Sequence, residues 1–512
     1  MPWPVGPVVG ECLGAGVGEG GFAQREFASA SPSLKDTPMY ALRNLLSILI
    51  LFTLSFTCFG KPSKPNVVFF LVDDLGGRDL GCYGSEFYES PNIDALADSG
   101  MLYTQAYAAC PVCSPTRAAI MTGKYPARVG ITDWIPGSSN WKKKTTRVIP
   151  PEDLHNLPYE ETTLAEAFKA AGYKTFFAGK WHLGETDEYW PEYHGFDINK
   201  GGFSKGSPTF KYYTPHGNPR LSDGPDGEHL TDRLGDETVA FLKANKDEPF
   251  FAYLSFYNVH TPLDPHKDYL DHFKDKAAAL PKAPKMRPEP LGPQTFYRQD
   301  NAVFASMVKA VDVNVGKVLD TLDELGLSDN TIVVFTSDNG GHSTTSNWPL
   351  RSVKGWCYEG GIRIPLIIRA PGVSDAGETS SVVTTSTDYY PTLLELAGLP
   401  LAPKQHVDGV SLASTLKGKG IDRDTVYWHY PHFHGSNWSP GAAVRSGKWK
   451  LIDFYELDKV ELYNMELDPQ EQRDLSKVLP EKTKELLTKL HSWQSSIGAQ
   501  MPVPNPLYRT SN

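Results

Sequence analysis

The stretch "NVVFFLVDDLG" at residues 66–76 places six consecutive apolar residues directly before two aspartates. These apolar residues do not alternate with polar ones, and valine and phenylalanine dominate among them. The pattern is typical of a strand buried on both faces, as in a parallel sheet covered by helices. Runs of the same character predict further buried strands at residues 174–178, 249–257, 331–337 and 365–370.

Segments between these runs carry apolar residues at helical spacing. Residues 90–100 and 162–172 begin at a serine or threonine and end at a glycine, as capped helices do. Residues 303–326 form a longer segment of the same kind. Because strand and helix patterns alternate along the chain, they predict an open α/β sheet.

The C-terminal part of the chain has a different pattern. Residues 387–400 predict one capped helix, in which Asp388 is expected only to start the helix. After it come strand-like pieces at 442–455, a turn-rich stretch at 461–476 and an amphipathic helix at 480–497. These patterns predict a smaller α+β domain packed on the first.

The length of 512 residues is too great for one compact core. We therefore predict an N-terminal extension with a signal peptide at residues 1–60, an α/β domain at 61–400 and an α+β subdomain at 401–512. Residues 261–300 contain many prolines and lysines and predict a long loop.

Residues 45–56 form an apolar run that is too short for a membrane-spanning helix, which needs about 20 residues. The run is typical of the central region of a signal peptide, and a buried helix is the alternative. We expect an exported protein, periplasmic or secreted, with no transmembrane segment in the mature chain. A lipid anchor on Cys58 is a further option, although residues 55–57 fit a lipoprotein site poorly.

The net charge of −10 argues against nucleic acid as the main partner, because phosphate binding needs a basic surface. An anionic substrate is still compatible with this charge, since a buried pocket can be cationic inside an acidic protein.

The predicted mature chain contains Cys82, Cys110, Cys113 and Cys357. Four cysteines are too few for a disulfide scaffold in a chain of this size. The cysteines are not followed by a Cys/His pair at zinc-finger spacing, and Cys110 and Cys113 lack a thioredoxin-like context. A disulfide among Cys82, Cys110 and Cys357 stays open.

Polar side chains follow four of the predicted strands directly. The residues at these strand ends are Asp73 and Asp74, Lys180 and His182, His260, and Asp338 and Asn339. In open α/β sheets, ligands bind at the carboxyl ends of the strands. A single strand end of this kind could be a helix cap, but four together indicate a site.

The residue types at this edge define a chemistry. Carboxylate and amide oxygens suit Ca²⁺ or Mg²⁺, which would act as a Lewis acid on a substrate oxygen. Cations for an anionic group are available from Lys180, Lys354 and Arg117, and His182 and His260 can transfer protons near neutral pH. The combination indicates cleavage of a phosphate or sulfate ester.

The sequence "CSPTR" at residues 113–117, followed by "AAIMTGKYPARVG", resembles the Cys-x-Pro-x-Arg signature of the formylglycine-dependent sulfatases. Other motifs agree in the same order, namely "NVVFFLVDDLG", "GKWHLG", "HTPL", "SDNGGH", residues 350–372 and "ELYNMELDPQEQRDL". The resemblance covers roughly residues 64–500. It implies an alkaline-phosphatase-like fold, in which helices sandwich a large mixed, mainly parallel sheet. A smaller α+β domain with a short antiparallel sheet and a C-terminal helix is implied as well.

The resemblance also implies that a maturation enzyme oxidises Cys113 to formylglycine (3-oxoalanine). Its hydrated form attacks sulfur with one hydroxyl and expels sulfate with the other. The implied bound metal is Ca²⁺ rather than Mg²⁺, with Asp73, Asp74, Asp338, Asn339 and the modified Cys113 as its ligands.

The remaining roles are implied in the same way. Arg117 would hold the diol and the metal ligands in place, and Lys180 and Lys354 would bind sulfate oxygens. His260 would protonate the leaving alcohol and His182 would take the proton of the second hydroxyl, although the two roles could be exchanged. Pro115 fits the first turn of a helix, so position 113 would lie at a helix N-terminus, which favours a nearby anion.

We expect a sulfated carbohydrate or an aryl sulfate as the substrate. The resemblance suggests exo action on sulfated galactose, galactosamine or uronic acid. One alternative is a phosphodiesterase or phosphonate monoester hydrolase of the same superfamily, for which a second set of metal ligands is not evident. Another is a protein that binds sulfated glycans without catalysis, if Cys113 is unmodified.

The stretch "WHYPHFHGSNW" at residues 428–438 combines three histidines with four aromatic rings. It could be a loop that faces the substrate or a packed strand and loop, and a separate metal site is a weaker option.

Overall fold

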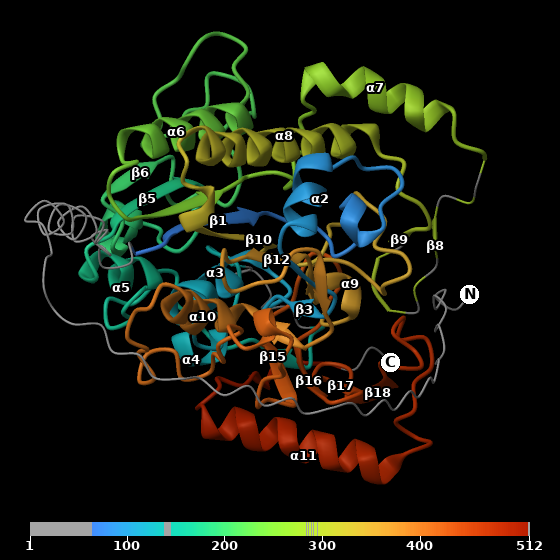
Figure 1. Ribbon diagram of the computed structural model, residues 1–512. Helices are drawn as coiled ribbons and strands as arrows, with labels where there is room; N and C mark the ends of the chain where they lie inside the picture. The colour runs from blue at the N-terminus through green and yellow to red at the C-terminus, as the bar shows by residue number, and fades with distance from the viewer. Residues whose placement is uncertain are drawn as a thin grey trace, which may run out of the picture. The chain divides into compact units, whose positions relative to one another are not determined.

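The computed structural model describes residues 64–137, 145–282, 284, 286–287, 289, 291–293 and 295–509. The predicted signal peptide and Cys58 lie outside these residues. An eight-stranded sheet forms the centre of the described chain (Figure 1), with the strand order β13-β2-β12-β10-β1-β7-β5-β6. The strands are β1 (Asn66–Val72), β2 (Met101–Tyr103), β5 (Lys174–Gly179), β6 (Ile198–Lys200), β7 (Phe250–Ser255), β10 (Thr331–Ser337), β12 (Leu366–Arg369) and β13 (Glu378–Ser380).

The sheet is mixed and mainly parallel, as predicted. Strand β1 pairs in parallel with β10 and β7, and β5 continues the parallel order to β6. Within this sheet, β12 runs against both of its neighbours. Every residue of β1, β7 and β10 is buried, which explains why these strands have apolar runs in place of alternation.

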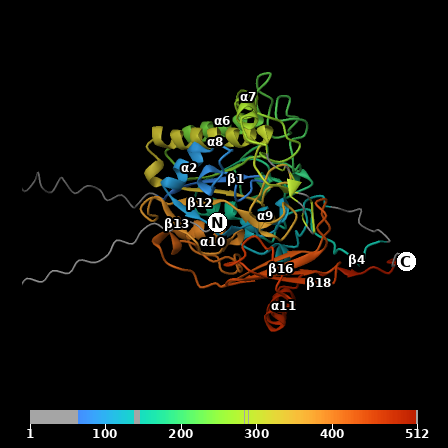
Figure 2. The same cartoon turned by 90° about the vertical axis from the view of Figure 1, so that its right-hand side faces the viewer.

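Helices cover both faces of the sheet (Figures 1 and 2). On one face lie α2 (Pro91–Asp98), α6 (Leu230–Ala244) and α8 (Ala302–Glu324), with α7 (Lys267–Ala278) against α8. The other face carries α3 (Cys113–Thr122), α5 (Leu164–Ala170) and α10 (Tyr389–Leu396). The cap predicted for α5 is present, because Thr163 and Glu166 form a capping box. None of the described helices is both long and apolar enough to cross a membrane.

The loop predicted at residues 261–300 is wrong in part, because it contains α7. Only one side of this helix contacts the protein, where Phe273 is fully buried and its ring lies 6.0 Å from that of Phe87. The other positions are mostly charged, so the segment resembles a polar loop in composition.

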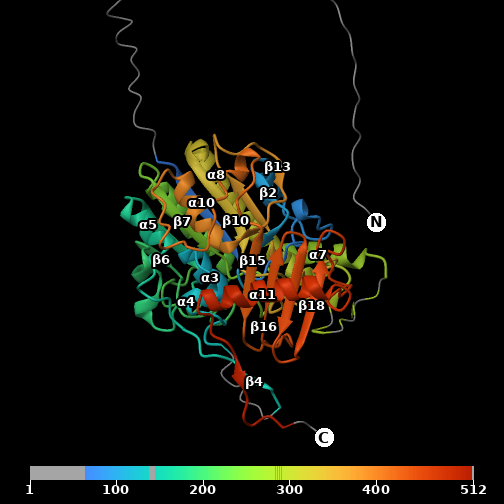
Figure 3. The same ribbon diagram turned by 90° about the horizontal axis from the view of Figure 1, so that it is seen from below.

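A four-stranded antiparallel sheet forms the C-terminal part, in the order β15-β16-β17-β18. Its strands are β15 (Thr425–Tyr430), β16 (Gly441–Ser446), β17 (Trp449–Phe454) and β18 (Lys459–Asn464). Helix α11 (Pro480–Ser496) lies across the strands (Figure 3) and buries Leu486 and Leu490 against them. The domain boundary at residue 400 stays a prediction.

The other face of this sheet packs on the α/β part. The indole of Trp356 contacts that of Trp438 at 5.3 Å between ring centroids, and Tyr358 lies 6.3 Å from Phe454. Beside these rings, the fully buried Lys450 Nζ lies 3.0 Å from Glu359 Oε1 and 2.8 Å from Glu471 Oε1. Aromatic packing and a shared buried cation therefore join the two sheets.

The remaining elements are short. They are β3 (Ala106–Tyr107), β11 (Arg363–Ile364) and β14 (Thr384–Thr385) in one small sheet, the pairs β4 (Val148–Ile149) with β19 (Val503–Pro504) and β8 (Met286–Arg287) with β9 (Thr295–Phe296), and helices α4 (Pro126–Val129) and α9 (Glu359–Ile362). Turns of 3-10 helix lie at Gly81–Tyr83, Asp187–Tyr189, Pro191–His194, Ser328–Asn330, Ser386–Asp388 and Thr415–Lys417. In the described chain, all the cysteines (Cys82, Cys110, Cys113 and Cys357) are free thiols.

Candidate active site

Two adjacent parallel strands bring four polar residues together. Because Val72 of β1 pairs with Ser337 of β10, the residues that follow them, Asp73, Asp74, Asp338 and Asn339, begin side by side. All four are fully buried. The amide of Asn339 donates to Asp74 Oδ1 at 2.8 Å, and the Asp74 main-chain N–H donates to Asp338 Oδ1 at 3.2 Å.

Three oxygen atoms of this group have no hydrogen-bond partner among the described residues. They are Asp73 Oδ1, Asp74 Oδ2 and Asn339 Oδ1. A buried acceptor without a partner is costly, so such atoms usually indicate a bound ion or water. Hard oxygen ligands of this type suit Ca²⁺ or Mg²⁺, and the residues present therefore fit a hard divalent cation.

Three cations surround the carboxylates. Lys180 Nζ lies 2.7 Å from Asp73 Oδ2, and Lys354 Nζ lies 2.6 Å from Asp74 Oδ1. Arg117 donates to Asp338 Oδ2 through Nε at 2.9 Å and Nη2 at 2.7 Å. Its Nη1 donates to the Lys180 carbonyl and to Ser255 Oγ, both at 2.8 Å, so α3 is fixed to the ends of β5 and β7.

These contacts set the charges of the acids. Burial raises the pKa of Asp73 well above its ordinary value, despite the nearby Lys180. Burial also opposes ionisation of Asp74 and Asp338, but the charge of Lys354 lowers the pKa of Asp74 and that of Arg117 lowers the pKa of Asp338. Asp74 and Asp338 are therefore held as carboxylates.

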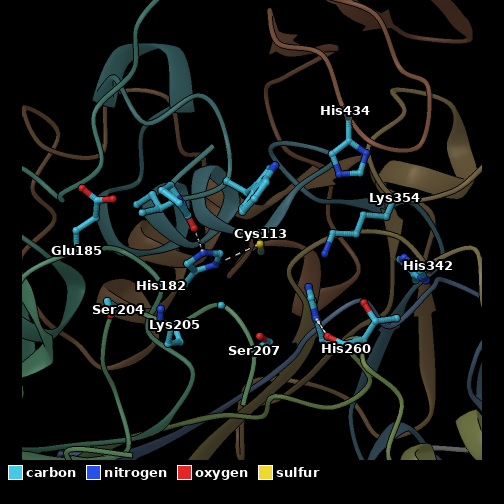
Figure 4. A pocket seen from close by; sticks show the side chains of 15 residues that line it. Cys113, His182, Glu185, Ser204, Lys205, Ser207, His260, His342, Lys354 and His434 are labelled. Atoms are coloured by element: carbon cyan, nitrogen blue, oxygen red, sulfur yellow. Dashed lines mark hydrogen bonds between the residues drawn. The ribbon is translucent and has the colours of Figure 1, made fainter. Parts of the chain in front are cut away.

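Cys113 is the first residue of α3 and is almost completely buried. Its Sγ lies 3.3 Å from His182 Nδ1, and His182 Nε2 lies 2.5 Å from the carbonyl oxygen of Ile135 (Figure 4). The Ile135 carbonyl can only accept, so Nε2 carries a proton and Nδ1 of the neutral ring is an acceptor toward Cys113. Burial, together with the charge of Lys180, lowers the pKa of His182 well below its ordinary value and keeps this ring neutral.

His260 follows β7, and Figure 4 shows it on the other side of Cys113 from His182. Its Nδ1 contacts the Thr261 carbonyl at 2.5 Å, and its Nε2 lies 3.9 Å from Asp74 Oδ2. Burial and the nearby Lys354 lower the pKa of His260 well below its ordinary value. Since Nδ1 donates to a carbonyl, the ring can act as an acid through Nε2 only in its doubly protonated form.

The backbone is left-handed at two of these positions, with φ of 61° at Asp74 and 60° at His182. Residues other than glycine seldom adopt this conformation, and it is found disproportionately at functional sites. The structure thus brings all ten sequence-predicted site residues into one group, from six separate segments.

The chain matches the family model described as "Sulfatase" over residues 65–399. The protein belongs to the sulfatase family. A second model, described as "N-sulphoglucosamine sulphohydrolase, C-terminal", matches this sulfatase at residues 352–497. The predicted family, in the alkaline phosphatase superfamily, and the predicted enzyme class, a sulfuric ester hydrolase, are both confirmed.

Named relatives align with most of this chain. A protein of Formosa agariphila named "Sulfatase" is 32% identical over 486 residues, which span 80% of this chain and 84% of the relative. The mouse N-acetylgalactosamine-6-sulfatase is 32% identical over 408 residues, 74% of this chain and 72% of the relative. The solved structure of Ps i-CgsB in complex with k-i-k-neocarrahexaose is 30% identical, with a TM-score of 0.70 over 88% of this chain and 96% of that one. The predicted fold is confirmed as well.

A pocket of about 530 Å³ opens at Cys113 and Lys354 of the sulfatase (Figure 4), and Lys354 contacts Asp74 of the acid group. Its floor contains Cys113, His182, His260 and Lys354, and its walls are formed by Trp134, Ile135, Pro136, Glu185, Ser204, Lys205, Gly206, Ser207, Thr261, His342 and His434. Sequence reasoning did not assign any of these wall residues. His342, Thr261 and His434 lie in motifs quoted from the sequence, whereas Glu185 lies outside them.

Residues 428–438 agree in part with each of the two main interpretations, a packed segment and a loop that faces the substrate. His429 and His432 are buried and bonded inside the protein, to the Gln500 carbonyl and to Thr132 Oγ1. Trp428 and Trp438 belong to the core between the sheets. His434 reaches the pocket of the sulfatase, so the segment is mostly packed and contributes one side chain to the substrate side.

A second group of metal-ligand types, His229, Asp232 and His266, lies outside the pocket. Asp232 accepts from His266 Nε2 at 2.9 Å and from Asn314 Nδ2 at 2.7 Å, and His229 Nδ1 accepts from the Thr231 N–H at 3.3 Å. His229 and His266 are the N-cap residues of α6 and α7. These contacts link the starts of the two helices, whereas His229 Nε2 and His266 Nδ1 have no hydrogen-bond partner among the described residues.

Proposed function

We propose that this sulfatase removes sulfate from a sulfated carbohydrate with a formylglycine made from Cys113 and a bound Ca²⁺. The observation that carries the proposal is the position of Cys113 on the pocket floor, beside a group of buried oxygens that lack partners. Asp73, Asp74, Asp338, Asn339 and the modified Cys113 would hold Ca²⁺, which when bound supplies a Lewis acid for the sulfate group. The hydrated aldehyde would supply a nucleophilic hydroxyl and a second hydroxyl for release of sulfate.

The charges around the floor suit an anionic substrate. Asp73, Asp74 and Asp338 face three cations, Arg117, Lys180 and Lys354. The group therefore has no net negative charge, whether or not Asp73 is ionised. A divalent cation would give the floor a net positive charge. This charge would attract the single negative charge of a sulfate monoester into the pocket of an acidic protein.

The hydrogen bonds of the two histidines support distinct roles. His182 Nδ1 is an acceptor directed at position 113, so His182 would remove a proton from a hydroxyl there. His260 contacts neither position 113 nor Lys180, and it is partly exposed to the pocket. It would protonate the leaving oxygen of the substrate from Nε2 in its doubly protonated form. The negative charge of a bound sulfate group would favour this form and oppose the effect of burial and Lys354 on the pKa of His260.

The pocket wall supports a carbohydrate as the substrate. It combines the indole of Trp134 with a carboxylate, an amine and hydroxyl groups from Glu185, Lys205 and Ser204. An apolar ring face with several polar groups suits a sugar ring, which has both apolar faces and hydroxyl edges. The names of two relatives point the same way, since one is an N-acetylgalactosamine-6-sulfatase and one was solved with a neocarrahexaose.

A substrate panel tests the proposal. Free sulfate is measured after incubation with monosulfated galactose, N-acetylgalactosamine and uronic acid disaccharides, with 4-nitrophenyl sulfate and with an aryl phosphodiester. We expect saccharide sulfates to give the highest kcat/KM. Faster turnover of the phosphodiester than of every sulfate would overturn the choice of sulfatase chemistry for this site.

Mass spectrometry of the peptide that contains residue 113 tests the modification. We expect formylglycine in protein from the native host or from cells that contain a maturation enzyme. An unmodified thiol in active native protein would contradict the proposed nucleophile.

We propose export on the basis of the apolar run at residues 45–56. N-terminal sequencing of the mature native protein tests it, and a start near residue 60 is expected. A mature chain that begins at residue 1 or 39 would contradict export by a cleaved signal peptide.

A further inference from the structure

His434 is the wall residue that the C-terminal part of the chain contributes to the pocket. It lies in the loop that leads from β15 to β16. Figure 4 shows His434 on the side of the pocket that carries Lys354, with Lys205 on the opposite side. A group from a separate part of the chain therefore lies directly beside a lysine proposed to bind sulfate.

The ring of His434 is held in a defined orientation. Its Nδ1 accepts from the Ser436 main-chain N–H at 3.2 Å and lies 2.7 Å from Ser436 Oγ. The Ser436 carbonyl in turn accepts from Trp356 Nε1 at 2.9 Å, which fixes the loop to the core. Because a main-chain N–H can only donate, Nδ1 is the acceptor of the neutral ring and Nε2 carries the proton.

Gly355 lets this ring approach the chain next to Lys354. Its backbone is left-handed, with φ of 87°, and a Cβ built there would lie 2.1 Å from His434 Nδ1. No larger residue fits without moving the histidine. The contact places His434 directly beside the chain segment that carries Lys354.

The ring stays neutral under working conditions. Burial and the charge of Lys354 lower the pKa of His434 to about 3. A cation bound on the pocket floor would lower this pKa further. The side chain therefore offers one N–H donor and no charge.

We infer that His434 Nε2–H donates to a hydroxyl oxygen of the sugar ring next to the scissile sulfate, and that it thereby determines specificity for saccharide sulfates. The inference rests on the proposed function. Lys180 and Lys354 already supply the cations for the sulfate oxygens, and the sugar ring of a substrate whose sulfur lies beside Cys113 has to occupy the space between the walls. A neutral donor in that space suits a hydroxyl group, which both accepts and donates.

Two substrates separate this role from a role in sulfate binding. The best saccharide sulfate of the panel carries ring hydroxyls, whereas 4-nitrophenyl sulfate carries none. We expect His434→Phe to lower kcat/KM for the saccharide about tenfold, mainly through KM, and to change it less than about twofold for 4-nitrophenyl sulfate. His434→Gln keeps an N–H donor and should recover part of the loss.

Controls exclude a general effect on the fold. His491 lies on α11 with a side chain that is 52% exposed, and His491→Phe should leave both substrates unaffected. If His434→Phe does not fold, deoxy analogues of the saccharide replace it as the test in the wild-type enzyme. One analogue should lose about the same factor in kcat/KM with the wild-type enzyme. The same analogue should lose a smaller factor with His434→Gln, whose amide only partly replaces the ring donor.

Three results would overturn the inference. Equal losses on both substrates would place His434 on the sulfate group, and no loss on the saccharide would show that the donor is not used. Unchanged kcat/KM for every deoxy analogue would likewise show that the donor is not used. Failure of the proposed function is seen separately, because a wild-type enzyme that cleaves 4-nitrophenyl sulfate and no saccharide contradicts the carbohydrate substrate before any variant is made.

Discussion

Arg117 donates to a single carboxylate oxygen of Asp338 through two nitrogen atoms, at 2.9 and 2.7 Å. The same guanidinium also binds the Lys180 carbonyl and Ser255 Oγ. Arg117 lies one turn after Cys113 on α3. Its guanidinium therefore connects the helix that carries the proposed nucleophile to the ends of three strands, β5, β7 and β10.

Arg117→Lys is expected to reduce kcat/KM about 100-fold, because one ammonium cannot make these contacts at once and Cys113 would shift. Steady-state kinetics with the best panel substrate measure the loss. Arg128→Lys is the matched control, since Arg128 binds Asp408 on the surface. Near-native turnover by Arg117→Lys would show that the guanidinium geometry is not needed.

Cys113→Ala is expected to abolish turnover and to keep the native melting temperature within a few degrees. Turnover is lost because the variant lacks the proposed nucleophile. The melting temperature changes little because the substitution removes only one small buried group. Cys110→Ala, three residues earlier and equally buried, should keep most of the activity. Activity assays and thermal unfolding of both variants provide the comparison, and an active Cys113→Ala would refute the nucleophile.

Removal of calcium is expected to abolish turnover and to lower the melting temperature, since an ion that binds only the folded state stabilises it. Readdition of Ca²⁺ should restore both properties, and Mg²⁺ should restore less. Asp338→Ala should lose calcium binding in calorimetric titrations. Full activity after exhaustive chelation, verified by elemental analysis, would contradict a metal-dependent site.

Glu471 should make the stability of the protein depend on pH. Burial raises its pKa to about 7, although Lys450 partly offsets the effect. A carboxyl whose pKa is raised on folding stabilises the protein fully below its unfolded value near 4.5, and this contribution is lost as the pH rises to about 7. The expected loss for such a buried group is about 3 kcal/mol.

Denaturation of wild type and Glu471→Gln at pH 5 and pH 8 tests this expectation. Because glutamine resembles the protonated carboxyl, the variant should be about as stable as wild type at pH 5 and more stable than wild type at pH 8. Glu481→Gln, an exposed substitution in the first turn of α11, is the control and should show the wild-type pH profile. A constant difference between wild type and Glu471→Gln would show that Glu471 does not titrate in this range.

The central strands and the floor of the site could be predicted because their signals are local. Fully buried strands such as β1 need apolar residues at every position, and the polar residue that follows each strand then stands out. Asp73 and Asp338 were found in this way. The motif around Cys113 and the order of the other motifs then indicated the family, which composition alone does not.

The pocket wall and α7 could not be predicted because their signals depend on distant contacts. His434 and His432 are two residues apart and chemically identical, but only the folded loop decides that one faces the pocket and the other faces Thr132. Likewise, the single buried ring of Phe273 in a charged segment is too weak a pattern to indicate a helix.

The contact between Trp356 and Trp438 has a practical consequence for anyone who divides this chain for expression. A fragment that stops at residue 400 would leave the rings of Trp356 and Tyr358 without the sheet that covers them, and it would leave Glu359 without the amine of Lys450. Such a fragment would be prone to aggregation and would have an open-sided cleft, so recombinant work should keep both halves in one polypeptide.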